Sequence, residues 1–93
     1  MDVIGILKQK LSEKAGVSQQ TNKPWVIAEF LLEIPGRVTT HSCLKVRDRD
    51  KITKFEQHLG KDVVVQIELD AREYQGRWFN EVNAWNIGLY VAR

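Results

Sequence analysis

The chain has 93 residues, of which 43% are hydrophobic and 28% are charged. This length suits one domain with a single core, and this composition excludes a disordered chain. The 14 Lys and Arg residues exceed the 12 Asp and Glu residues by only two, so a local cluster of basic side chains would have to hold any polyanionic partner. We expect one folded domain over residues 1–93.

Cys43 is the only cysteine, which rules out an intrachain disulfide and predicts a reducing compartment, the cytoplasm. Residues 1–8 carry neither a basic leader nor a long apolar core. We therefore expect no signal peptide and no membrane span.

The first half of the chain reads as two strands and a loop. Residues 3–11 mix β-branched and long aliphatic residues, which is typical of a strand. Residues 15–24, rich in Gly, Ser, Gln, Thr and Asn, predict a flexible loop. Residues 25–34 alternate as a second strand. Its expected core face holds Val26, Ala28, Phe30, Leu32 and Ile34.

A third strand is expected over residues 37–47, after the turn dipeptide Pro35-Gly36. One of its faces would hold Val38, Thr40, Ser42, Leu44 and Val46. The other would hold Arg37, Thr39, His41, Cys43, Lys45 and Arg47. Four of these last six side chains are basic or can become so, the most asymmetric charge pattern in the chain.

A short helix and a fourth strand should follow. Asp50 is the expected N-cap, and Gly60 is the expected C-terminal stop. The helix would share one face among Ile52, Phe55 and Leu59. Residues 62–72 alternate as a strand, with Val63, Val65, Ile67, Leu69 and Ala71 expected to point inward.

The chain should end in a β-hairpin that turns at Gly76 and returns over residues 78–89. Neither register of this last strand buries only apolar residues, so we expect a β-bulge near Trp78 or Asn83. Aromatic side chains serve as core more often than as ligand contacts. We accordingly expect Trp78, Phe79 and Trp85 to close the barrel.

Three strands, a short helix and two further strands are the element order of an all-β OB-fold, a five-stranded Greek-key barrel with the helix between strands three and four. An SH3-like barrel fits the helix position and the long last hairpin less well. In OB-folds the ligand surface is the outer face of the second and third strands, flanked by the first and last hairpin loops.

The run A-R-E-Y-Q-G-R-W-F-N-E-V-N-A-W, preceded by V-V-V-Q-I-E-L-D, resembles the signature of a family of short bacterial proteins. That family is known mainly from Bacteroidetes and is described as a domain of unknown function. It is similar to OB-fold single-stranded DNA-binding proteins and to primosomal replication protein B. The resemblance extends from the first strand through Trp85 and implies an OB-fold. The chain has no glycine-rich linker or acidic C-terminal tip of the bacterial single-stranded DNA-binding kind, so recruitment of repair enzymes is not predicted.

The sequence contains few residues that could form a catalytic or metal-binding site. The candidate zinc ligands are Cys43, His41 and His58, and His58 is expected on the helix, away from the other two. No phosphate loop is present, and no base or orienting partner is specified for a nucleophile. We expect a protein that is not an enzyme and needs no metal and no cofactor.

Basic and aromatic side chains fall where an OB-fold binds its ligand, which predicts single-stranded DNA as the partner, with RNA as the alternative nucleic acid. The candidate contacts are Lys23, Trp25, Arg37, His41, Lys45, Arg47, Arg72, Tyr74 and Arg77. Trp25 and Tyr74 would stack on bases, and the arginines and Lys45 would meet phosphates. The alternative is a protein-interaction or homodimer surface. It would use Trp25, Ile27, Leu31 and Trp85.

Overall fold

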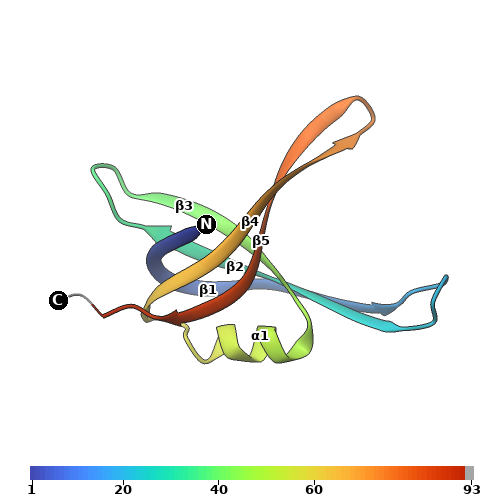
Figure 1. The fold of residues 1–93 in the computed structure, drawn as a ribbon, viewed down its shortest axis with the longest axis horizontal. Coiled ribbons are helices and arrows are strands. Elements are labelled where there is room, and N and C mark those ends of the chain that lie inside the picture. Colours follow the sequence, from blue (N-terminus) through green and yellow to red (C-terminus); the bar gives the residue numbers. More distant parts are fainter. Residues whose placement is uncertain (92–93) are drawn as a thin grey trace.

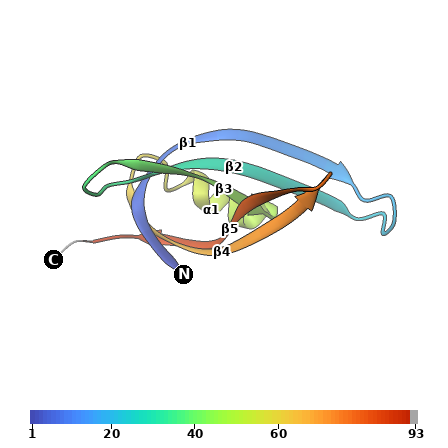
Figure 2. The same ribbon diagram turned by 90° about the horizontal axis from the view of Figure 1, so that it is seen from above.

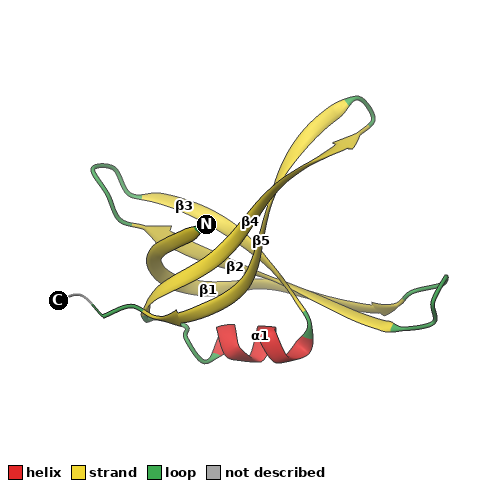
Figure 3. Cartoon of the chain, viewed as in Figure 1, coloured by secondary structure: helices red, strands yellow, loops and turns green. Residues whose placement is uncertain are grey.

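The computed structural model describes residues 1–91 and contains five strands and one short helix. Its elements are β1 (Asp2–Val17), β2 (Pro24–Ile34), β3 (Thr40–Arg47), α1 (Arg49–Glu56), β4 (Asp62–Tyr74) and β5 (Arg77–Leu89) (Figures 1 and 3). The strands close a barrel in the order β1-β2-β3-β5-β4, in which only β3 and β5 run parallel. This is the predicted OB-fold.

Strand β1 closes the barrel because it pairs with two different strands. Residues 2–6 pair with β4, and residues 6–17 pair with β2. Gly5 lies at this changeover, where a Cβ atom would come within 2.4 Å of the Glu33 carbonyl oxygen. A side chain there would push β1 away from β2, so glycine permits the bend.

The core fills the barrel and extends under α1. Phe30 of β2 and Phe55 of α1 are both fully buried, with ring centroids 5.5 Å apart. Ile52 is buried beside them, and α1 lies across one end of the barrel (Figure 1). The predicted inward face of β2 is confirmed, and so are Val63, Val65 and Ile67 on β4.

Several predicted boundaries are wrong. Strand β1 continues to Val17, because residues 15–17 pair with residues 24–26 of β2. Only residues 18–23 form the loop, which is closed by a hydrogen bond of 2.8 Å from the Asn22 amide to the Ser18 carbonyl. Cross-strand pairing has overridden the local preference of this polar segment. Strand β3 begins only at Thr40, and Val38 is 74% exposed in the preceding loop.

The helix also differs from the prediction at both ends. It begins at Arg49, with Asp48 rather than Asp50 as its N-cap residue, and the Asp48 side chain makes no capping hydrogen bond. It ends at Glu56, so Leu59 lies in the following turn and is 37% exposed. Gly60, with a φ of 82°, ends that turn, where left-handed backbone favours glycine.

The register conflict of β5 is resolved by a bulge at Trp85. Gln66 of β4 pairs with Asn86, whereas the next residue, Ile67, pairs with Ala84, which leaves Trp85 as the extra residue. Ala84 and Ile87 can then both point inward. The expected bulge is confirmed, and it lies two residues beyond Asn83, one of its two predicted positions.

The hairpins β1–β2 and β4–β5 both extend past the barrel (Figures 1 and 2). Leu69, predicted to point into the core, is therefore 61% exposed, and Ala71 is exposed as well. The three aromatics predicted to close the barrel are also on the surface. Trp78 is 68% exposed, Phe79 52% and Trp85 48%.

Candidate nucleic-acid interface

The outward face of β2 and β3 continues onto the last hairpin. Strand alternation places residues 25, 27 and 29 of β2 on this face, where Ile27 pairs with Arg47 and Glu29 pairs with Lys45. Lys45 in turn bridges to Asn83 on β5. Because directly paired residues share a face, the side chains of β2, β3 and β5 form one continuous outer surface.

Three basic side chains of this surface converge on a single carboxylate. Lys45 Nζ lies 2.5 Å and Arg47 Nη2 lies 3.3 Å from Glu81 Oε1, while Arg72 Nε lies 2.9 Å from Glu81 Oε2. We call Lys45, Arg47, Arg72 and Glu81 the Glu81 cluster. The Glu81 side chain is only 10% exposed. The hydrogen bond from Lys45, helped by the charges of Lys45 and Arg72, lowers the pKa of the Glu81 carboxyl despite its desolvation.

The Glu81 cluster has hydrogen-bond donors to spare, and it shares its outer face with Glu29, Glu68 and Asp70, which pair with Lys45, Asn83 and Glu81. Its three cations and one anion leave two positive charges, and the side chains of Arg47 and Arg72 are 46% and 66% exposed. A guanidinium has five N–H donors, so both arginines can bind a phosphate oxygen without leaving Glu81. Sequence reasoning missed Glu81, because the uncertain register of β5 hid which face it occupies.

The tip of the β4–β5 hairpin presents aromatic rings beside arginines on the same face. Arg72 pairs with Phe79, and Tyr74 pairs with Arg77. Tyr74 is 67% exposed and Phe79 is 52% exposed. Phe79 is two residues from Glu81 and so points to the same side. It is a stacking candidate that the sequence analysis had assigned to the core.

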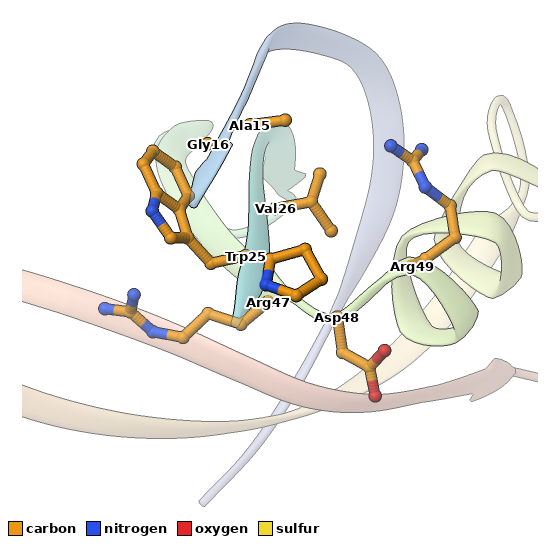
Figure 4. A pocket seen from close by; sticks show the side chains of 8 residues that line it. Ala15, Gly16, Trp25, Val26, Arg47, Asp48 and Arg49 are labelled. Carbon is orange, nitrogen blue, oxygen red and sulfur yellow. The ribbon is translucent and has the colours of Figure 1, made fainter. Parts of the chain in front are cut away.

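At the other end of the surface, Trp25 borders an open pocket of about 610 Å³. Its lining residues are Ala15, Gly16, Pro24, Trp25, Val26, Arg47, Asp48 and Arg49. The indole lies against Gly16, where a Cβ atom would come within 2.7 Å of Trp25 Cζ2. Figure 4 shows the Trp25 ring and the Arg47 side chain extending to the same side of β2. Trp25 keeps 43% of its surface exposed.

The remaining predicted contacts are more scattered. Lys23 lies in the β1–β2 loop, directly before Pro24 of the Trp25 pocket, and is exposed. His41, exposed near the start of β3, pairs with Glu33. Arg37 lies in the β2–β3 loop, at the opposite end of the molecule from the two protruding hairpin turns (Figure 1). His41 lies on the same outward face of β3 as Lys45, so the fold brings seven of the nine predicted residues onto one surface, namely Trp25, His41, Lys45, Arg47, Arg72, Tyr74 and Arg77.

Two further features bear on the kind of site. Within residues 1–91, no group of three or more His, Cys, Asp or Glu side chains is arranged to hold a metal ion. No helix in this part of the chain has the length and hydropathy to cross a membrane.

The closed five-stranded barrel with a helix between β3 and β4 defines an OB-fold protein. Residues 2–88 match the domain of unknown function DUF3127, and the chain belongs to that family. The predicted resemblance to a family of unknown function is thereby confirmed, while a Bacteroidetes origin stays a prediction. No curated protein matches the chain.

Solved structures that share the fold include two single-stranded DNA-binding proteins. The mitochondrial single-stranded DNA-binding protein Rim1 of S. cerevisiae aligns with a TM-score of 0.69 and 15% identity, over 96% of this chain and 91% of that one. The small single-stranded DNA-binding protein of Streptomyces coelicolor aligns with a TM-score of 0.52 and 13% identity, over 98% of this chain and 93% of that one. At these identities the likeness concerns the fold.

Proposed function

We propose that this protein binds single-stranded DNA, without catalysis, along the surface from the Trp25 pocket through the Glu81 cluster to the hairpin tip. The observation that carries the proposal is the gathering of Lys45, Arg47 and Arg72 between exposed aromatics at both ends. Both structural neighbours named above are single-stranded DNA-binding proteins, which supports the same ligand class here.

Each part of the surface has a distinct role in this proposal. The cations of the Glu81 cluster and Arg77 bind phosphates, and counterion release there favours association. The rings of Trp25, Tyr74 and Phe79 stack on bases, each contributing about 1 to 3 kcal/mol. Stacking on rings accepts every base, so we expect little sequence preference. The single exposed thiol of Cys43 is consistent with action in a reducing compartment, which we take to be the cytoplasm.

Titration of fluorescein-labelled oligo(dT) followed by anisotropy tests the proposal. We expect wild-type protein to bind at low salt, and the variant Arg47→Gln/Arg72→Gln to bind at least about tenfold more weakly, because two charged hydrogen bonds to phosphates are lost. The matched control, Lys8→Gln/Lys61→Gln, removes the same charge outside the Glu81 cluster and should bind nearly as wild type. A parallel titration with oligo(rU) shows whether RNA is also bound.

Two outcomes would overturn the proposal. One is a wild-type protein that binds neither oligonucleotide at low salt. The other is an equal loss of affinity in the two double variants, which would mean that total charge rather than this surface holds the strand.

A homodimer surface is the second candidate. Ile27 and Leu31 of the expected patch are half-buried in the monomer and offer little area. Leu69 and Trp78, on the hairpin face opposite Glu81, are 61% and 68% exposed and unpartnered in the described chain. Light scattering after size exclusion decides: a monomer at all accessible concentrations would exclude self-association through this patch, and a dimer lost in Leu69→Ser would support it.

A further inference from the structure

Trp85 is exposed because of the bulge on β5, and the proposed function gives it no role. Regular alternation after Ala84 would have paired it with Gln66, but Asn86 takes that place and Trp85 is left unpaired. Bulges redirect side chains and recur near binding sites. The Trp85 ring is 48% exposed, so a large apolar surface faces solvent beside α1.

A small pocket of about 210 Å³ lies between this ring and the helix. It is lined by Asp50, Lys51, Lys54, Phe55, Trp85 and Asn86. Lys54 Nζ donates a hydrogen bond of 2.9 Å to Asn86 Oδ1, which holds the ammonium group at the rim. The two lysines outweigh Asp50 by one positive charge. An aromatic wall with cations at its rim suits a base and its flanking phosphates.

This Trp85 pocket adjoins the end of the proposed DNA surface. Strands β3 and β5 run parallel and bridge at Lys45 and Asn83. Two residues further along each strand come Arg47, a member of the Glu81 cluster, and Trp85. The chain then passes from Arg47 directly into α1, which supplies Lys51 and Lys54. Arg47 also lines the Trp25 pocket, so two continuations of the path begin at this residue, one toward Trp25 and one along α1 toward the Trp85 pocket.

We infer that the Trp85 pocket is a second nucleotide-binding site, used by single strands long enough to continue past the Glu81 cluster. This inference rests on the proposed function and extends its path. The exposed indole stacks on one unpaired base, and Lys51 and Lys54 bind the phosphates on either side of it. The pocket thereby sets the length of DNA that one protein molecule occupies.

A length series of oligo(dT) titrated against wild type and Trp85→Ala tests the inference. Loss of one stacked base should weaken binding of the long oligonucleotides by about 5- to 150-fold. The affinity for the shortest oligonucleotide that the wild type still binds should be the same in Trp85→Ala. Trp85→Phe keeps an aromatic face and should recover most of the affinity. The matched control is Trp78→Ala, which removes an even more exposed ring from the hairpin face opposite Glu81 and should leave the affinity for every length unchanged.

A second measurement keeps the test decisive if Trp85→Ala folds poorly. In Trp25→Phe/Trp78→Phe protein, Trp85 is the only tryptophan, and long but not short oligo(dT) should quench its fluorescence. Equal affinities of wild type and Trp85→Ala at all lengths, or no quenching of Trp85, would overturn the inference and leave the proposed function standing. If the wild-type protein binds no oligonucleotide, both the inference and the proposed function are refuted.

Discussion

Glu81 has two opposite effects on the binding surface. Its carboxylate holds Lys45, Arg47 and Arg72 in place, and it also cancels one of their three charges. At low ionic strength the charge effect should dominate, because the cations stay close together on paired strands and the potential at the surface rises.

We therefore expect Glu81→Gln to bind oligo(dT) several-fold more tightly than wild type at low salt, with the gain shrinking as salt screens the charges. Anisotropy titrations at two salt concentrations measure this. Glu73→Gln, which removes the same charge on the hairpin face of Trp78, is the control and should change affinity less. Weaker binding by Glu81→Gln would instead assign Glu81 mainly to positioning the cations.

Glu13 links β1 to the start of α1 and predicts a pH dependence of stability. Its carboxylate binds Arg49 through two contacts of 3.0 Å and Lys10 through one of 2.7 Å. These hydrogen bonds, the Arg49 bond first, lower the pKa of Glu13 from 4.5 to about 2. A lowered folded-state pKa stabilises the fold above pH 4.5, and the stabilisation is lost as the pH falls toward 2.

Melting temperatures of wild type and Glu13→Gln across this pH range measure the effect. Wild type should be the more stable protein at pH 6 to 7, and the difference should close between about pH 4.5 and pH 2. If the melting temperatures of the two proteins differ by the same amount at every pH, the Glu13 ion pairs contribute nothing to stability.

The β4–β5 hairpin depends on a turn with left-handed backbone at both central residues, Gln75 with a φ of 51° and Gly76 with a φ of 80°. This is the pattern of a type I′ turn. Gly76→Ala should cost about 1 to 2 kcal/mol, because a Cβ disfavours this conformation. The hairpin extends beyond the core, so faster hydrogen exchange of its amides should reveal the loss more clearly than global melting. Unchanged exchange would contradict this role of Gly76.

The sequence predicted a strand correctly where burial of one face determines its residue pattern. Alternation of apolar residues placed β2 and the first half of β4 correctly, because burial on one side sets that pattern. The apolar alternation did not predict segments that are held by strand pairing but bury no side chains in the core. Residues 15–17 extend β1 by pairing with β2, and Leu69 lies on a hairpin that has left the barrel. The same protrusion exposes Phe79, and the bulge exposes Trp85, which is why stacking candidates were mistaken for core.

The candidate site was likewise predicted in part. The basic face of β3 was visible in the sequence, since charge on alternate residues requires only that the strand exist. Its convergence with Arg72 on Glu81 was not, because that contact depends on how β3, β4 and β5 align in the closed barrel. Arg37 shows the converse. It continued the basic pattern but lies in the loop before β3.

The balance of charge over the whole molecule predicts how binding responds to salt. The net charge of +2 is too small to attract DNA at every face, so the response should come from the few phosphates held by the Glu81 cluster and Arg77. If three or four phosphates are neutralised, log K against log salt should have a slope of roughly −2 to −3, and Arg47→Gln/Arg72→Gln should reduce its magnitude by about 1.4. Oligo(dT) titrations at four or more salt concentrations supply both slopes. A slope near zero in wild type would mean that stacking alone holds the strand, and a slope unchanged in the double variant would place the phosphates on another face of the barrel.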